Sequence, residues 1–382
     1  MRINRILVPF ISLLLLTACG QVDSAPTLIV PTVSATVEVR TPTPTPLPIF
    51  PTPAVTIMST GSAPAWNPLT GLPLESPAQL EQRPLLIKVS NFPRNNRPQW
   101  GLSKADMVFE HYAEGGLTRF SALFFGQEAE IVGPIRSARF IDLELVDMYG
   151  AIFAYGSADY RVREAIAVSD FANRAVTEYP ARCPPMCRYD PSNLNHLVTN
   201  TVDLRQYLRE KGVPEAVVDL KGMAFNYEIP TGGETGNELE IHYSVGNFHK
   251  WVFDPDGDVY LRWQEVGSDE QETLLLEDRL TDEPIQAANA ILLVVPHTYI
   301  TPSPEFVRIE LFGEGRAIAF RDGQAFEIRW RRPAGGGILR FETASGDSFP
   351  LHPGSTWVEL VNTSSEIKEQ EPGHWWVRFH IP

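Results

Sequence analysis

The chain has 382 residues, of which 43% are hydrophobic and 21% are charged, a composition typical of a globular protein with about two domains. It contains 32 Lys and Arg against 47 Asp and Glu, which gives a formal net charge of −15. A surface of this sign repels a nucleic-acid backbone, so we expect no nucleic-acid partner.

The first residues are typical of a bacterial export signal. Arg2 and Arg5 accompany a short apolar run over residues 6–16, which is too short to span a membrane. The small residues before Cys19 resemble a lipobox, in which the cysteine is acylated and becomes the first residue of the mature chain. We expect residues 1–18 to be a lipoprotein signal peptide; a plain secretory signal is the alternative. This predicts an extracytoplasmic protein, lipid-anchored to the bacterial cell membrane through Cys19, and does not indicate which membrane in a two-membrane cell.

Residues 19–65 are rich in threonine and proline and are predicted to be a tether. The stretch TPTPTPLPIFPTP, residues 41–53, favours polyproline II over helix or sheet. At ~3.1 Å per residue this stretch alone spans about 40 Å. The sequence leaves open whether its threonines carry glycans.

Residues 66–218 alternate between strand-like and helical patterns. Strands are predicted over 84–91, 107–113, 117–125 and 151–157, and amphipathic helices over 138–150, 159–170 and 201–212. Interleaved strands and helices favour a mixed α/β domain.

Residues 219–382 show short strand-like segments separated by turn pairs. The pair Asp322-Gly323 is predicted to turn the strand GRAIAF back on AFEIRW. Repeated short strands of this kind predict a smaller, antiparallel β-rich domain. The whole chain is therefore expected to be of the α+β or α/β class.

The cysteines that remain after Cys19 predict a disulfide and no metal centre. Cys183 and Cys187 flank a short loop with two prolines, which in an exported chain favours a structural disulfide. A zinc site would need more ligands, and His196 is the nearest further candidate. The eight histidines show no metal-binding spacing, so we expect neither a metal nor a cofactor.

A hairpin over residues 109–125 is the first part of a candidate site. If Gly115 and Gly116 form a two-residue turn, Tyr112 lies opposite Arg119. Strand alternation then divides the side chains into two faces. The expected polar face carries Glu110, Tyr112, Glu114, Arg119 and Ser121, and the expected core face carries Phe109, Ala113, Phe120, Ala122 and Phe124.

The stretch VGPIRSAR, residues 132–139, is the second part. If it begins a helix, Ser137 can cap the free amides, and Arg136 and Arg139 lie on one side of the first turn. Such amides and guanidinium groups attract a carboxylate, a phosphate or an acidic protein side chain. The alternative is an internal network, in which these arginines pair with Glu110, Glu114 or Glu144 and only stabilise the domain.

Several longer segments resemble one known family. NPLTGLPL (67–74), RPLLIKVSN (83–91), RPQWGLSKADMVFE (97–110), EGGLTRFSALF (114–124) and VGPIRSAR together resemble the YerB-like lipoprotein family, a bacterial family of unknown function. FGEGRAIAFRDGQAFEIRW and LHPGSTWVEL resemble its C-terminal domain. The resemblance implies an exported lipoprotein with an α/β N-terminal domain and a β-rich C-terminal one, and it implies no catalytic role. The matched site positions are Glu110, Glu114, Gly115, Gly116, Arg119, Gly133, Pro134, Arg136, Ser137 and Arg139.

These observations predict a membrane-tethered lipoprotein that binds a component of the cell envelope, either a polymer or a protein. The ligand-binding candidates are Glu110, Glu114, Arg119, Arg136, Ser137 and Arg139. One alternative is a hydrolase of wall glycan or peptide that uses Glu110 or Glu114 as acid or base. Another is a protein-interaction module with its interface on the β-rich domain. The sequence does not establish a reaction, a ligand or an oligomeric state.

Overall fold

The fold is taken from a computed structural model, which describes residues 64–190, 192, 195–267, 272–333 and 336–381. The predicted signal peptide, Cys19 and nearly all of the tether lie outside the described residues. The described residues belong to one compact unit.

The main element is an 11-stranded mixed sheet, to which both halves of the chain contribute. The first half supplies β1 (Leu85–Ser90), β2 (Met107–Glu114), β3 (Leu117–Phe124), β4 (Ile152–Ala154) and β5 (Ala175–Val176). The second half supplies β9 (Glu234–Thr235), β15 (Asn289–Val295), β18 (Gly313–Arg321), β19 (Gln324–Arg332), β20 (Arg340–Glu342) and β22 (Thr356–Asn362). The order is β20-β19-β18-β15-β22-β2-β3-β1-β4-β5, with β9 beside β19.

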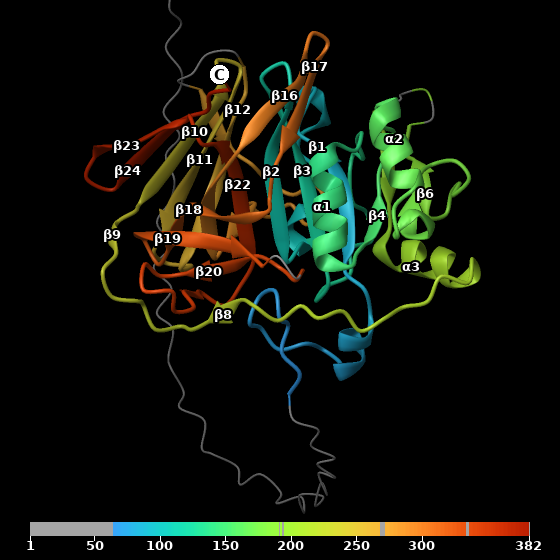
Figure 1. Cartoon of the computed structure of the whole chain (residues 1–382), viewed down its shortest axis with the longest axis horizontal. Helices are drawn as coiled ribbons and strands as arrows, with labels where there is room; N and C mark the ends of the chain where they lie inside the picture. The colour runs from blue at the N-terminus through green and yellow to red at the C-terminus, as the bar shows by residue number, and fades with distance from the viewer. Residues whose placement is uncertain (1–63, 191, 193–194, 268–271, 334–335, 382) are drawn as a thin grey trace, which may run out of the picture. The chain divides into compact units, whose positions relative to one another are not determined.

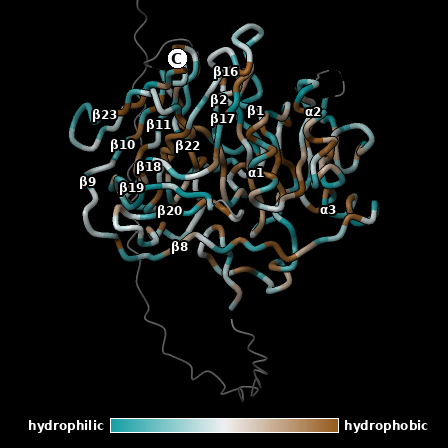
Figure 2. The backbone as a smooth tube through the Cα atoms, in the orientation of Figure 1, coloured by the Kyte–Doolittle hydropathy of each residue, from teal (hydrophilic) through white to brown (hydrophobic). Residues whose placement is uncertain are grey.

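The centre of this sheet is covered on both faces. All residues of β1 and of β22 are buried, as expected for apolar strands with layers on each side. Figure 2 shows hydrophobic residues gathered along these central strands. Within the sheet, β22 runs parallel to both β2 and β15, and β1, β4 and β5 are also parallel to one another.

Three helices lie beside the β1–β4 end of the sheet (Figure 1). They are α1 (Phe140–Tyr149), α2 (Tyr160–Ala167) and α3 (Thr201–Glu210). Helix α1 ends at Gly150, whose φ of 55° is the left-handed conformation that glycine adopts without a steric penalty. The Asn200 side chain caps α3 by accepting hydrogen bonds from Val202 and Asp203.

A second, 7-stranded sheet packs on the β22 region of the main sheet. It is ordered β13 (Thr273–Leu275), β12 (Val259–Glu265), β11 (Asn247–Asp254), β10 (Glu238–Ser244), β24 (His374–Arg378) and β23 (Glu366–Glu371), with β14 (Gln286–Ala287) beside β12. Aromatic contacts join the two sheets: the rings of Trp251 and Trp357 are 5.1 Å apart, and those of Tyr260 and Phe320 are 6.4 Å apart. Pairs at these separations add to the stabilisation from burial alone.

Three two-stranded sheets and four 3-10 helices complete the described elements. The strand pairs are β16 (His297–Pro302) with β17 (Glu305–Ile309), β21 (Pro350–Leu351) with β8 (Ala224–Phe225), and β6 (Met186–Arg188) with β7 (Leu197–Thr199). The 3-10 helices are η1 (Pro77–Glu81), η2 (Arg94–Asn96), η3 (Leu102–Lys104) and η4 (Ala172–Arg174).

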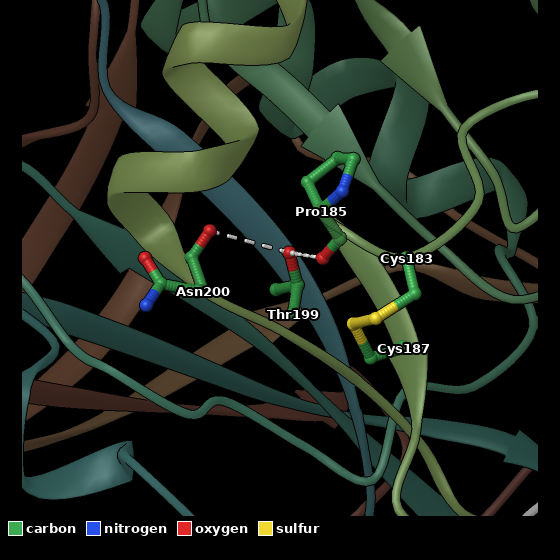
Figure 3. Close-up of a disulfide and its surroundings, with 5 residues drawn as sticks. All are labelled: Cys183, Pro185, Cys187, Thr199 and Asn200. Carbon is green, nitrogen blue, oxygen red and sulfur yellow. Dashed lines mark hydrogen bonds between the residues drawn. A yellow bond between two sulfur atoms is a disulfide. The ribbon is translucent and has the colours of Figure 1, made fainter.

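The predicted fold class is confirmed, with a mixed sheet in the first half and mainly antiparallel strands in the second. The predicted Cys183–Cys187 disulfide is also present and joins the loop before β6 to Cys187 within that strand (Figure 3). The domain boundary between 218 and 219 stays a prediction. No helix within the described ranges is long and apolar enough to cross a membrane.

Candidate functional site

A pocket of about 370 Å³ opens beside the carboxyl ends of the parallel strands β1 and β4. The extended segment 135–137 forms one wall, since Arg136 N–H donates to Lys88 O of β1 and Gly156 N–H donates to Arg136 O. In open α/β sheets, ligands commonly bind at this edge. The pocket is lined by Ile135, Arg136, Ser137, Gly156, Ser157, Arg188, Asn195 and Leu197.

Arg136 reaches this pocket without a carboxylate partner. Its Nε donates to Ser90 Oγ at 3.2 Å and its Nη2 to Phe92 O at 3.3 Å, and both acceptors are neutral. Burial and the neighbouring Arg139 charge lower the pKa of the Arg136 guanidinium. Among the residues that the structure describes, no acidic group forms an ion pair with Arg136, so its charge is not balanced by a direct contact.

Arg119 is a second, more deeply buried cation near Arg136. It lies on β3 opposite Ser90 and is only 8% exposed. Its Nη1 donates to Thr118 O at 2.8 Å, whereas its Nε has no hydrogen-bond partner within the described part of the chain. Burial lowers the pKa of Arg119 to about 10; Arg139 and Arg136 also lower it, and Glu114 opposes them.

Glu114 is bound by Arg139 in a two-pronged ion pair. Arg139 Nε donates to Glu114 Oε2 at 2.7 Å, and Arg139 Nη2 donates to Oε1. Glu114 thus pairs directly with Arg139 and also acts electrostatically on the nearby Arg119. On the other wall of the pocket, Arg188 pairs with Glu178 at 2.5 Å.

The predicted register of the β2–β3 hairpin is wrong. A β-bulge between Tyr112 and Glu114 inserts one extra residue, so Tyr112 lies opposite Thr118 and not Arg119. A shift of one residue moves the side chains beyond it to the other face of a strand. Glu110 consequently pairs with Phe120, a residue of the expected core face, and is separated from Arg119.

The predicted role of Ser137 as a helix cap is also wrong. Residues 135–138 are extended, α1 begins at Phe140, and Ser137 Oγ lies 2.8 Å from Ser157 Oγ instead. Arg139 occupies the N-cap position, and its backbone N–H donates to Asp142 Oδ2 at 2.6 Å. Asp142, which is three residues into the helix, thus satisfies the amide that we expected Ser137 to serve.

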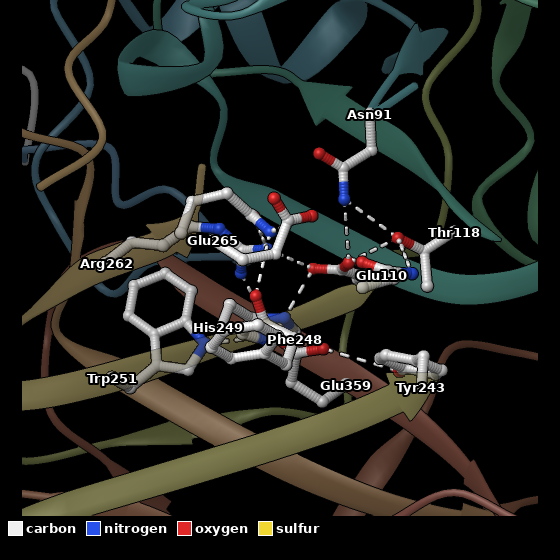
Figure 4. A network of polar contacts seen from close by, with 12 residues as sticks. Asn91, Glu110, Thr118, Tyr243, Phe248, His249, Trp251, Arg262, Glu265 and Glu359 are labelled. Carbon is white, nitrogen blue, oxygen red and sulfur yellow. Dashed lines mark hydrogen bonds and ion pairs between the residues drawn. The ribbon is translucent and has the colours of Figure 1, made fainter. Parts of the chain in front are cut away.

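Glu110 belongs to a buried network between the two large sheets (Figure 4). Arg262 Nη2 donates to Glu110 Oε2 at 2.7 Å, and Thr118 Oγ1 donates to Glu110 Oε1, also at 2.7 Å. Asn91 Nδ2 adds a contact of 3.3 Å. Glu110 is fully buried, so its carboxylate is satisfied internally.

The same network includes Glu359 of β22. Its Oε1 is 2.8 Å from His249 Nε2, 2.9 Å from Trp251 Nε1 and 3.3 Å from Arg262 Nη1. Burial raises the pKa of Glu359 to about 7 and lowers that of His249 to about 3. Glu110, His249 and Glu359 together offer metal-ligand atoms, but the Arg262 guanidinium already supplies the cation. We interpret this network as structural.

A second buried cluster lies on the opposite face of the main sheet, under α1. Lys88 Nζ is 2.7 Å from Asp142 Oδ1 and 2.9 Å from Ser121 Oγ, and it also contacts His111. Burial lowers the pKa of Lys88 to about 8 even though Asp142 opposes the shift. All four residues are fully buried, which leaves no access for a substrate.

Sequence reasoning missed four charged residues that the structure places at these sites: Lys88, Asp142, Arg188 and Arg262. Lys88 carried a recognisable signal, because it interrupts the apolar strand LLIKVS. Arg188 and Arg262 carried none, since nothing in the residues around either one indicates that the fold brings it to a site.

Two family profiles match the two halves of the described chain. The N-terminal domain of "Protein of unknown function (DUF3048)" matches residues 69–214, and the C-terminal domain matches residues 239–358. Together they cover more than half of the chain and lie in the expected order. The chain belongs to the DUF3048 family.

Relatives of this DUF3048 protein include a lipoprotein of Bacillus subtilis (strain 168). "Putative lipoprotein YerB" is 28% identical over 299 residues, which are 77% of this chain and 85% of the relative. The crystal structure of YerB from Bacillus subtilis has a TM-score of 0.67 and 26% identity, covering 78% of this chain and 96% of that one. The Arg136 pocket lies wholly within the segment matched by the DUF3048 N-terminal domain.

Proposed function

We propose that this chain is a lipid-anchored extracytoplasmic protein that binds an anionic component of the cell envelope in the Arg136 pocket. Two observations support the anchor. Residues 1–18 resemble a signal peptide with a lipobox before Cys19, and the Bacillus subtilis relative is named as a lipoprotein. The lipid on Cys19 would hold the protein at the membrane, and the tether would let the folded unit reach the envelope.

The uncompensated charge of Arg136 carries the proposal. Arg136 lies at a pocket, donates to neutral acceptors alone among the residues that the structure describes, and belongs to a protein whose formal net charge is −15. A partly buried guanidinium without an acid is costly, and an anionic ligand would remove that cost. The buried guanidinium of Arg119, whose Nε has no hydrogen-bond partner among the described residues, adds to the positive potential around Arg136.

The walls of the pocket suggest roles for the other groups. Arg136 and Arg188 would contact a phosphate or carboxylate from two sides. Ser137 and Ser157 are hydrogen-bonded to each other, so the hydroxyl that accepts in that pair would donate a hydrogen bond to the ligand. Glu114 would hold Arg139 in place and leave Arg136 to the ligand. Glu110, as a partner of Arg262, would take no part in binding.

The hydrolase alternative receives no support from a specific contact. Glu110 is fully buried in its pair with Arg262, and Glu114 is occupied by Arg139. The two carboxylates also face different layers of the protein, so they do not form the facing pair that a glycosidase needs. The protein-interaction hypothesis stays a prediction.

The test compares two charge deletions in the full chain. Arg136→Ala should weaken co-sedimentation with isolated bacterial envelope material at least tenfold and leave the melting temperature within about 2 °C of the parent. Arg329→Ala is the matched control, since Arg329 is exposed and pairs with Glu314 on another part of the surface. Inorganic phosphate should compete with the envelope material for the unmodified protein.

Other outcomes of this comparison would contradict the proposal. Binding that survives Arg136→Ala, or that falls equally in Arg329→Ala, would overturn the pocket as the binding site. A large drop in melting temperature without a binding defect would assign Arg136 to an internal structural role instead.

A further inference from the structure

A cluster of carboxylates and histidines lies on the outward face of the 7-stranded sheet, away from the Arg136 pocket. Glu238, Glu240 and His242 occupy alternate positions of β10, while Leu239 and Ile241 between them are fully buried. The three polar side chains therefore share the face opposite to the core.

The neighbouring strand β24 completes the cluster. It runs parallel to β10, and its first residue, His374, lies opposite Glu238 in the register. His374 Nε2 is 3.4 Å from Glu238 Oε1 and 3.2 Å from Glu240 Oε2. The ligand atoms of these three residues all lie within 4.8 Å of one another.

The two separations from His374 Nε2 match the ligand spacing of zinc. Zinc binds imidazole nitrogen and carboxylate oxygen at about 2.0–2.2 Å in tetrahedral geometry. The edge of such a tetrahedron is about 1.6 times the metal–ligand distance, which gives ligand-to-ligand separations of about 3.3–3.6 Å. The contacts of His374 with Glu240 and Glu238, at 3.2 and 3.4 Å, lie at and just beyond the upper end of the usual hydrogen-bond range and are close to these edges.

Glu240 has a hydrogen-bond partner of the kind that usually orients a metal ligand. Its other oxygen, Oε1, lies 2.5 Å from His242 Nε2, and the His242 ring stacks on Phe248 at a centroid distance of 5.0 Å. A hydrogen bond of this kind from a fixed ring orients a ligating carboxylate. Glu240 can thus present Oε2 toward His374 without losing its partner on Oε1.

A cation already lies at this cluster. Lys250 of β11 places Nζ 3.0 Å from Glu238 Oε1 and 3.8 Å from Glu240 Oε2. Its side chain is 30% exposed and can rotate into water, in contrast to the fully buried Arg262 of the interior network. A divalent ion could therefore displace the Lys250 ammonium group from these carboxylates. The Arg262 guanidinium is fully buried and has no such route into water.

We propose that Glu238, Glu240 and His374 form a zinc site, with His242 as the group that orients Glu240. The fourth position is left to water or to a ligand. Sequence spacing could not reveal this site, because His374 lies 134 residues from Glu240 along the chain. The site is independent of the proposed anion pocket.

The test is a Zn²⁺ titration of the full chain after removal of metals by a chelator, with a chromophoric chelator as competitor. We expect one Zn²⁺ per chain, bound at least tenfold more weakly by His374→Ala and by Glu240→Gln. Lys250→Met should bind Zn²⁺ more tightly than the parent, because it removes the competing charge. His380→Ala, which removes an exposed histidine outside the cluster, should bind as the parent does.

Arg136→Ala serves as a second control and should leave Zn²⁺ binding unchanged. Circular dichroism of each variant checks that the fold is retained. Absence of saturable binding by the parent below about 0.1 mM Zn²⁺, or equal affinity in parent and His374→Ala, would overturn the site and leave the cluster as a salt-bridge network.

Discussion

Glu110 of β2 and Arg262 of β12 form a 2.7 Å ion pair across the interface of the two large sheets, and both side chains are fully buried. The same guanidinium reaches Glu359 at 3.3 Å and lies over the ring of Trp357, 4.7 Å from its centroid. One cationic side chain from the second sheet therefore contacts two acids of the first.

Arg262→Met should strongly destabilise the protein. Methionine fills a similar space but leaves Glu110 and Glu359 without their cation, and breaking a buried pair in this way costs about 3–5 kcal/mol. The free energy of unfolding, measured with urea, should fall by that amount. Arg316→Ala removes an exposed arginine that pairs with Glu327, and it should change stability by less than about 1 kcal/mol. Similar stabilities of the two variants would contradict the assigned role of Arg262.

His297 should make the protein sensitive to acid. Burial lowers the pKa of His297 to about 4, whereas a histidine in the unfolded chain titrates near 6.5. Between these values the unfolded chain binds the proton more strongly, so stability falls as the pH drops from about 6.5 to 4 and is unaffected by this group above that window.

His297→Gln removes this dependence. The loss of unfolding free energy between pH 7 and pH 5 should be about 2 kcal/mol smaller in the variant than in the parent, from about 1.5 pH units at ~1.4 kcal/mol each. Glu359, whose pKa of about 7 is raised, acts in the opposite direction, but it is common to both proteins and cancels in the comparison. Parallel pH profiles for variant and parent would show that His297 does not titrate as stated.

The Cys183–Cys187 disulfide should stabilise the loop before Arg188. The closed loop is short, and for about five residues the chain-entropy estimate is about 2 kcal/mol. Replacing both cysteines by serine should lower the free energy of unfolding by about that amount. A reducing agent should cause the same loss in the parent and none in the double-serine variant. A parent that is unaffected by reduction, with its thiols shown to be free, would contradict this contribution.

Much of the fold follows from local pattern. The strand LLIKVS and the helix after Arg139 appear within two residues of their expected positions, because apolar periodicity and the glycine at 150 are local signals. The parallel partners of β22 could not be predicted in the same way, since β2 and β15 lie far from it in sequence. Hydrogen-bond partners between distant strands leave no mark in a single sequence.

The candidate site was predicted only in part. Arg136, Arg139 and Glu114 do lie near one another, as the pattern of charges indicated. The bulge at Ala113 carries no distinctive residue, so the expected two-residue turn placed Glu110 on the wrong face. Arg188 comes from β6, about 50 residues after Arg136, and only the fold brings it to the pocket.

The pairing of β2 with β22 has a consequence for how the protein reaches its native state. About 250 residues separate the two strands, so at about 5–20 residues per second β2 is synthesised roughly 12–50 s before its partner. During that interval one side of β2 has unpaired amide and carbonyl groups that can join a strand of another molecule. The nascent chain should therefore depend on a holding chaperone, or on delayed folding, until β22 has been made.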